Sequence, residues 1–209
     1  MSFNVRLFDD YLCSNQSWSD KWVQRPIHNG SDEIAIVRAT VDDVPVVLNI
    51  LDATWGTTPF SEVPRRTKEL EEYATTGLAI WLATKVADGT PMGQNQHSKG
   101  MNGGAPRTII GALAVEERAS HAPPVSGPEL YVQFVVTDRK WTGKGVGKRL
   151  LKHARDLANE AGVALLWVDC YAGGEYYESQ EFKRSGSFSL ESGWPGQVLA
   201  QQLHGMKGE

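Results

Sequence analysis

One segment near the middle of the chain, residues 134–151, joins a β-branched run to a glycine-rich turn and then to an apolar helical period. Gly143, Gly145 and Gly147 alternate with other residues where that period begins. Glycine adopts positive φ angles and leaves no Cβ between the backbone and a ligand. The first turn of a helix adds unpaired N–H groups and the positive end of the helix dipole. The segment therefore predicts a strand, a tight turn and a helix start that binds an anion, with phosphate as the favoured ligand.

Two common phosphate-binding motifs do not fit this segment. A P-loop has four residues between its first glycine and its Gly-Lys pair, and then Ser or Thr as a magnesium ligand. Here three residues separate Gly143 from Gly147, and Arg149 follows Lys148. A dinucleotide fingerprint that begins at Gly143 needs a third glycine at position 148, where the chain has lysine. Of its other features only an acidic residue about twenty positions further on, Asp169, is present.

Residues 142–147 resemble the pyrophosphate loop of the GNAT N-acetyltransferase superfamily, Arg/Gln-x-x-Gly-x-Gly/Ala. Thr142 stands where the family has Arg or Gln, but the family holds the pyrophosphate mainly through backbone N–H groups. The resemblance implies acetyl-CoA as co-substrate and no metal. The residues that it implies for cofactor binding are Phe134, Val135, Val136, Thr142, Gly143, Lys144, Gly145, Val146, Gly147 and Lys148.

A second segment resembles the same family. Residues 165–171 predict a buried strand, and Tyr177 to Phe182 follow the family pattern Tyr-x-x-x-Gly-Phe, with Glu181 in place of glycine. In the family this tyrosine often protonates the departing CoA thiolate, so Tyr177 inherits the role of catalytic acid. Tyr176 is adjacent and is the competing candidate. An aromatic pair packed on the sheet is an equally simple account of either tyrosine taken alone.

The resemblance implies an α/β (α+β) fold: a single domain with a central mixed, mostly antiparallel sheet, splayed at the cofactor site and flanked by helices. We expect residues 1–32 to form an N-terminal extension and residues 33–209 to form the domain. Hydrophobic periods predict the elements in detail. Thr40, with Asp43 three residues later, predicts a capping-box-like start of the first helix. Helices are expected at 44–55, 63–76 and 143–161, and strands at 33–39, 78–86, 108–116, 129–136, 165–171, 183–190 and 197–203.

Acetyl transfer to an amine needs a base that deprotonates the amine. The resemblance implies a carboxylate on the central strands, and Glu129 is our choice. Glu116, Glu117 and Asp169 are alternatives at strand ends, and His121 is a weaker one. The acceptor pocket is expected between the first two helices and the loop 119–128. Its aromatic candidates for substrate binding are Trp55, Phe60 and Tyr131.

Composition excludes several other classes of function. A formal net charge of −4 argues against a nucleic-acid-binding face. Two cysteines cannot form a disulfide framework, and no Cys/His spacing suits zinc. Cys170 is better explained as a buried structural thiol than as a nucleophile, because no paired histidine is evident. The chain also lacks a signal-like start and an apolar run of membrane-spanning length. We therefore expect a cytoplasmic protein without a membrane partner, with a homodimer left open.

The preferred interpretation is an acetyl-CoA-dependent N-acetyltransferase that acts on the primary amine of a small molecule by direct attack. Two alternatives stay open. The first is a protein or peptide N-acetyltransferase, and the second is a non-catalytic CoA-binding sensor that kept the nucleotide site. Turnover separates the sensor from both enzymes, and the size of the acceptor separates the two enzymes.

Overall fold

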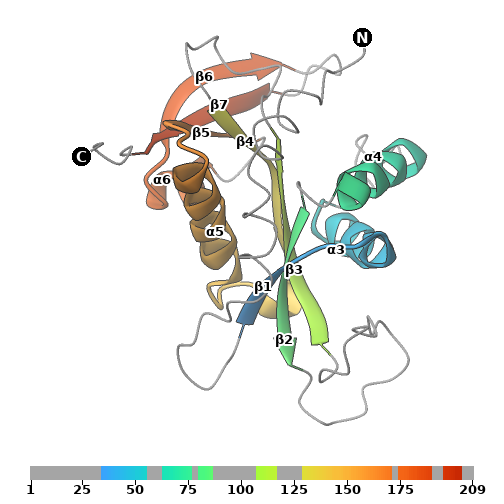
Figure 1. The fold of residues 1–209 in the computed structure, drawn as a ribbon. Coiled ribbons are helices and arrows are strands. Elements are labelled where there is room, and N and C mark those ends of the chain that lie inside the picture. Colours follow the sequence, from blue (N-terminus) through green and yellow to red (C-terminus); the bar gives the residue numbers. More distant parts are fainter. Residues whose placement is uncertain are drawn as a thin grey trace.

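The computed structural model describes residues 34–55, 63–76, 80–86, 107–116, 129–170, 174–189 and 195–203. They form a seven-stranded sheet with helices on both faces (Figure 1). The strand order is β1-β2-β3-β4-β5-β7-β6, with β4 and β5 parallel and the other neighbouring pairs antiparallel. The expected mixed, mostly antiparallel α/β fold is confirmed. The expected extension 1–32 lies outside the described residues.

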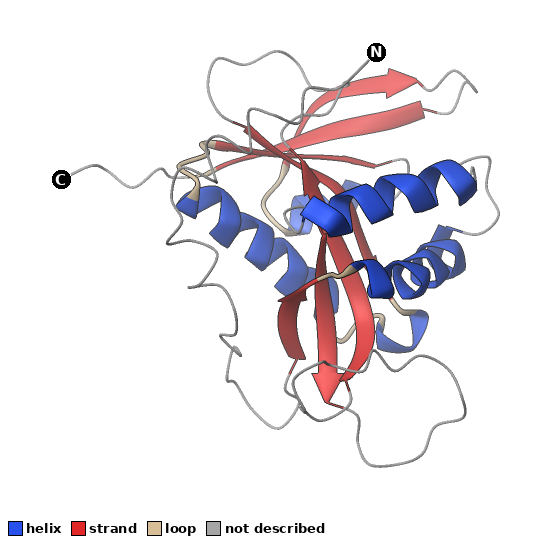
Figure 2. Cartoon of the chain, turned by 45° about the vertical axis from the view of Figure 1, so that its right-hand side comes forward, coloured by secondary structure: helices blue, strands red, loops and turns tan. Residues whose placement is uncertain are grey.

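The elements follow the predicted order. The strands are β1 Ile34–Arg38, β2 Ile80–Val86, β3 Arg107–Glu116, β4 Glu129–Thr137, β5 Leu165–Cys170, β6 Lys183–Ser189 and β7 Pro195–Gln202. The helices are η1 Val41–Asp43, α3 Val44–Trp55, α4 Val63–Thr76, η2 Arg139–Trp141, α5 Val146–Glu160 and α6 Gly174–Ser179. The sheet is strongly twisted, and in Figure 2 the strands at its upper end run almost across those below.

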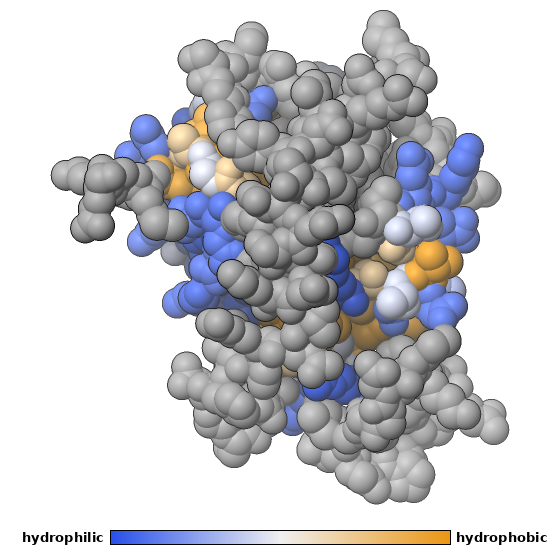
Figure 3. Space-filling model, viewed as in Figure 1, coloured by the Kyte–Doolittle hydropathy of each residue, from blue (hydrophilic) through white to orange (hydrophobic). Residues whose placement is uncertain are grey.

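Helix α5 covers one face of the sheet. Its apolar residues recur with the helical period, and Val146, Leu150, Leu151, Ala154 and Ala158 are buried in the core beneath it. Hydrophilic side chains cover its outer side, on the left in Figure 3. The helix begins at Val146, three residues later than predicted, because residues 142–145 form a turn. It ends at Glu160, one residue before the predicted end, and Gly162 follows with a φ of +68°.

Helices α3 and α4 cover the opposite face (Figure 1). Val47 and Leu51 of α3 and Leu70 of α4 pack with sheet residues in a second core. The predicted start at Thr40 is confirmed, since the Thr40 N–H donates a 2.8 Å hydrogen bond to Asp43 Oδ2. The intervening residues form the short helix η1 before α3 begins.

A bulge at Gln133 changes the direction of side chains along β4. Ala114 of β3 pairs with Phe134 and Val115 pairs with Val132, so Gln133 is an extra residue. Before the bulge, Val132 packs in the core under α5. After it, Phe134 packs in the core under α3 and α4, although it lies two residues further on. A one-residue shift of register reverses the faces of a strand, which accounts for the switch.

The strands β4 and β5 separate at the same place. Their pairing ends at Val132 with Val168, although β4 continues to Thr137 and β5 to Cys170. We call the wedge between these unpaired strand ends the splay and the pair Val132–Val168 its apex. The predicted splay of the sheet is therefore confirmed, and it opens toward the turn that begins α5.

Candidate active site

The turn between β4 and α5 is held by its own backbone. Asp138 Oδ1 accepts a 2.9 Å hydrogen bond from the Lys140 N–H, and the Thr142 and Lys144 N–H groups donate to Arg139 O and Trp141 O at 3.3 and 3.2 Å. These bonds fix the backbone of residues 138–144. The glycines at 143 and 145 then set the path of the chain into helix α5.

Gly143 and Gly145 have φ angles of +77° and +79°, which L side chains rarely adopt. A Cβ built on either glycine would meet no atom within 4 Å, so the space beside the turn is open. The first hydrogen bond of the helix runs from the Arg149 N–H to Gly145 O at 3.1 Å. The N–H groups of Val146, Gly147 and Lys148 precede that bond and lie at the positive end of the helix dipole. Such an arrangement binds anions.

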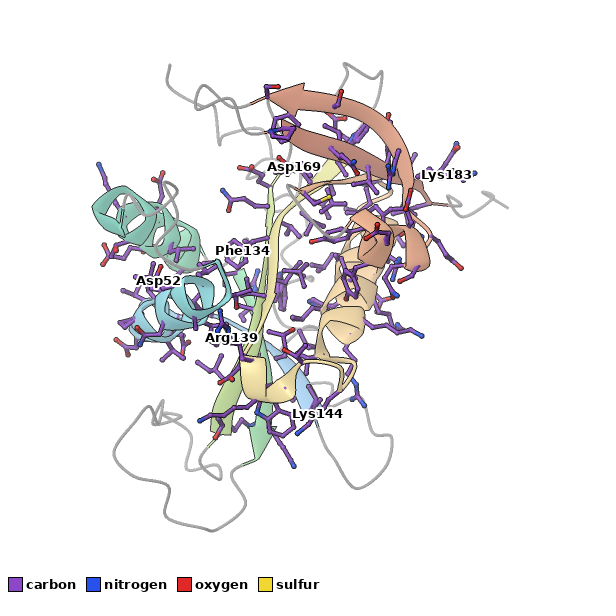
Figure 4. The ribbon with its side chains drawn as sticks, turned by 180° about the vertical axis from the view of Figure 1, so that it is seen from behind. Asp52, Phe134, Arg139, Lys144, Asp169 and Lys183 are labelled. Carbon is purple, nitrogen blue, oxygen red and sulfur yellow. The ribbon has the colours of Figure 1, made fainter. Side chains whose placement is uncertain are left out.

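Lysine side chains surround the turn. Lys144 and Lys148 are exposed, and Lys144 Nζ lies 4.4 Å from the centre of the Trp141 ring. Lys85 Nζ, at the end of β2, lies 5.1 Å from the same ring. In Figure 4 the Lys144 side chain lies at the lower end of α5, where the splay is widest. Trp141 therefore holds two positive charges beside the glycine turn by cation–π contact.

Most of the apolar residues predicted for cofactor binding have buried side chains that pack in the two cores. Phe134 and Val136 are buried under α3 and α4, and Val146 is buried beneath the turn. Val135 is half-buried on the side of α5. The side chains of Phe134 and Val136 thus serve as scaffold, and the role of this stretch in cofactor binding stays a prediction.

The two adjacent tyrosines of α6 point to different places. Tyr177 is half-buried and packs edge-to-face on Phe182 at 5.9 Å. Burial raises its pKa, and the nearby Cys170 raises it further. Tyr176 is 41% exposed, and its hydroxyl would lie 2.5 Å from a Cβ placed on Gly147. The structure thus places Tyr177 beside β5, at the splay, and Tyr176 over the first turn of α5.

Cys170 is buried at the end of β5. Burial raises the pKa of its thiol first, and neighbouring Asp169 raises it further. A raised pKa keeps the sulfur protonated and poorly nucleophilic. This environment agrees with a structural role.

Glu181 has a φ of +71°, and it is the one non-glycine residue in the described part of the chain with a positive φ. It follows α6 at the position where the family pattern has glycine. The Phe182 N–H donates to Tyr177 O at 3.1 Å and closes the turn. Glu181 thus has the left-handed backbone conformation that glycine would adopt without strain at this position.

Two carboxylates lie on the sheet face away from α5. Trp167 Nε1 donates a 2.8 Å hydrogen bond to Glu129 Oε2, and the Tyr131 hydroxyl donates to Asp169 Oδ1. Asp169 directly follows the apex of the splay, whereas Glu129 begins β4, three residues before the apex. Asp169 is the last residue but one of β5, and Figure 4 labels it above Phe134.

The predicted acceptor residues are only partly described. Tyr131 is buried with Trp167 and Val198. Trp55 is the last residue of α3, and its side chain lies outside the described part, as does Phe60 altogether. Of the alternative bases, Glu116 ends β3 opposite Tyr131, while Glu117 and His121 lie outside the described residues.

Among the described residues, no three or more His, Cys, Asp or Glu side chains form a group that could hold a metal ion. No helix in those ranges is long and apolar enough to cross a membrane.

Several solved structures are similar to this chain in fold. The ribosomal-protein-S18-alanine N-acetyltransferase from Escherichia coli has a TM-score of 0.55 and 18% identity, over 84% of this chain and 97% of that one. The NatC complex bound to Gag peptide and CoA has a TM-score of 0.59 and 14% identity, over 82% and 99%. N-acetylglutamate synthase from Neisseria gonorrhoeae, with coenzyme A and N-acetyl-glutamate, has a TM-score of 0.57 and 16% identity, over 84% and 36%.

Identities this low establish the fold alone, and no curated protein sequence matches the chain. The family comparison is more specific. Residues 48–180, more than half of the chain, match the acetyltransferase (GNAT) family, and they include the glycine turn, the splay and both tyrosines. The chain belongs to the GNAT acetyltransferase family.

Proposed function

We propose that the chain is an acetyl-CoA-dependent N-acetyltransferase that transfers an acetyl group to the primary amine of a small molecule by direct attack. The observation that supports this most is the splay, which opens directly onto the glycine turn of α5. From the apex at Val132 to the end of β4 at Thr137 the strand extends roughly 17 Å. A long, narrow wedge that ends at an anion-binding turn suits a diphosphate joined to an extended pantetheine arm.

The turn supplies the charge and the donors for the diphosphate. The N–H groups of Val146, Gly147 and Lys148 and the helix dipole would face it, with Lys144 and Lys148 at its rim. The absence of a Cβ at Gly143 and Gly145 leaves the space that the phosphates need. Acetyl-CoA, when bound, supplies a thioester whose acetyl carbon accepts the amine.

Asp169 is the better-placed general base. Its position next to the apex brings its carboxylate to the closed end of the splay, and the Tyr131 hydroxyl holds Oδ1. In this role Asp169 takes a proton from the attacking amine nitrogen. Glu129, our choice from the sequence, lies further from the apex and is bonded to Trp167. It remains the competing base.

Tyr177 is the proposed acid. Burial raises its pKa, so the phenol stays protonated near neutral pH and can donate its proton to the departing sulfur. Its ring is held by Phe182 and by the core, which fixes the hydroxyl relative to β5. The proposed acid and base thus both follow Val168 in the chain, with Tyr177 packed against the core under α5 and Asp169 on the opposite face of the sheet.

A compact amine is the proposed acceptor. The mild net charge of −4 and the aromatic candidates Trp55, Phe60 and Tyr131 support a small acceptor with an apolar body. A peptide acceptor is the second candidate, since two of the similar structures are a ribosomal-protein acetyltransferase and a peptide-bound complex. A non-catalytic CoA sensor is the third. A cytoplasmic location and a homodimer stay predictions.

A screen for thiol release from acetyl-CoA tests the proposal. The panel contains compact primary amines and unstructured peptides, and a matched set without acceptor measures background hydrolysis. We expect acceptor-dependent thiol release with at least one compact amine. Release with peptides alone would favour the second candidate. CoA binding without any acceptor-dependent release would favour the sensor.

A further inference from the structure

The Tyr176 hydroxyl reaches from α6 to the first turn of α5. A Cβ on Gly147 would lie 2.5 Å from that hydroxyl oxygen and 3.4 Å from Cζ of the same ring. The Thr137 hydroxyl, at the end of β4, would lie 3.8 Å from the same Cβ. Two hydroxyls therefore converge on Gly147, one from each side of the splay, next to the N–H groups that precede the first bond of α5.

The ring of Tyr176 is carried by an anchored element. Arg155 of α5 donates a 2.6 Å hydrogen bond to Gln180 O, just after α6, and a 2.7 Å bond to Gln201 Oε1 of β7. The Ser179 hydroxyl donates to Tyr176 O at 2.6 Å, and the ring packs edge-to-face on Tyr177 at 5.3 Å. These contacts tie α6 to α5, so the backbone that carries the Tyr176 side chain is fixed relative to Gly147.

We propose that Tyr176 is a further cofactor-binding residue, whose hydroxyl donates a hydrogen bond to the diphosphate end of acetyl-CoA at the turn of α5. The inference rests on the proposed function. A phenol donor beside the N–H groups of α5 would strengthen the binding of an anion there, because hydrogen bonds to charged acceptors are stronger than those between neutral groups. Tyr176 then differs in role from its neighbour Tyr177, since the former holds the cofactor and the latter protonates the leaving sulfur.

The close approach also explains why residue 147 is glycine. Alanine at this position would place a methyl group against the Tyr176 hydroxyl, and the phenol would move because it is the end of a side chain. Gly147→Ala and Tyr176→Phe should therefore remove the same contact by different means. Gly186→Ala is the matched control, because a Cβ on Gly186 meets no atom within 4 Å.

Calorimetric titration with CoA tests this in the wild type, the two single variants, their combination and the Gly186→Ala control. We expect each single variant to bind CoA about tenfold more weakly, as for the loss of one charge-assisted hydrogen bond. The combination should bind no more weakly than either single variant, because coupled sites are not additive. The control should bind like the wild type.

Two results would overturn the inference while leaving the proposed function intact. One is wild-type affinity in Tyr176→Phe. The other is an additive loss in the combined variant, which would mean that the alanine methyl itself obstructs CoA. No CoA binding by the wild type would overturn both proposals together. Thermal melting without CoA provides a second readout, and there Tyr176→Phe should match the wild type because the side chain is 41% exposed.

Discussion

The two halves of the sheet, which meet at the splay, differ in how they are covered. Strands β1 to β4 lie between α5 on one face and α3 and α4 on the other, and each face has its own core. Around the apex, where the start of β4 pairs with β5, a small cluster of Tyr131, Trp167 and Val198 lies on the face away from α5, beside two hydrogen-bonded carboxylates. Substitutions in the core of the first half should therefore change stability, and those of the proposed acid and base near the apex should change rates.

Tyr177→Phe has the largest expected effect. The change keeps the ring on Phe182 and removes the proton donor, so kcat should fall by about 10²–10⁴, the usual contribution of a positioned acid. CoA affinity, measured by calorimetry, should stay nearly the same. Normal turnover in this variant together with lost turnover in Tyr176→Phe would move the acid to the neighbouring residue.

Asp169→Asn tests the base. The amide cannot accept the amine proton, and kcat should fall by about 10²-fold or more. Glu129→Gln is the matched variant, because both carboxylates accept one side-chain hydrogen bond on the same face. Glu129→Gln should retain most of the wild-type kcat in the same assay. The reverse ranking would return the role of base to Glu129.

The pH dependence of stability at His153 tests the role of the first half of the sheet, β1 to β4, in stability. Its imidazole is buried against Trp81, with ring centroids 4.3 Å apart, and burial lowers its pKa to about 4. Asp156 opposes this shift and Lys152 adds to it. Below its ordinary pKa of about 6.5 the unfolded chain binds a proton that the folded chain does not, so stability falls as pH falls toward the folded value.

From about pH 7 to about pH 5, the wild type should lose about 2 kcal/mol of unfolding free energy through this group. His153→Gln should remove that part of the pH dependence in urea unfolding curves, while kcat at neutral pH changes little. Identical pH dependence in the two proteins would show that the imidazole titrates normally.

Glu181→Gly has the smallest expected effect. The left-handed φ of +71° costs a side-chain-bearing residue roughly 1 kcal/mol, which glycine avoids. The variant also loses the 3.3 Å contact between Gln201 Nε2 and Glu181 Oε2. We expect a net gain in unfolding free energy of less than about 1 kcal/mol by thermal melting. A clear loss of stability would mean that the side-chain contact outweighs the backbone strain.

The glycine turn proposed for the cofactor was predictable from sequence, because its backbone conformation is encoded locally. Alternating glycines before a helical period encode the turn at 142–145 locally, and the positive φ angles of Gly143 and Gly145 agree with that prediction. The helix start was misplaced by three residues, since glycine spacing alone does not say which glycine is the last of the turn. The N-terminal cap at Thr40 was likewise a local signal.

The surroundings of the proposed acid and base were less predictable, because their geometry depends on strand register. Hydrophobic alternation along β4 does not reveal the bulge at Gln133, and without it Phe134 would share a face with Val132. Tyr131 was predicted as a pocket wall, but pairing with β5 brings its hydroxyl onto Asp169. Likewise, the approach of Tyr176 to Gly147 joins segments about thirty positions apart in sequence, beyond the reach of any local pattern.

We infer that the glycine turn and the splay form a CoA site, and CoA titration of the wild type and Gly145→Val is the sharpest test of this site. Valine at a φ of +79° is strained and fills the open space beside the turn. In metal-free buffer the wild type should bind CoA, and the variant should bind about 100-fold more weakly while keeping its fold by circular dichroism. Unchanged affinity in Gly145→Val, or an absolute need for magnesium in the wild type, would contradict the account.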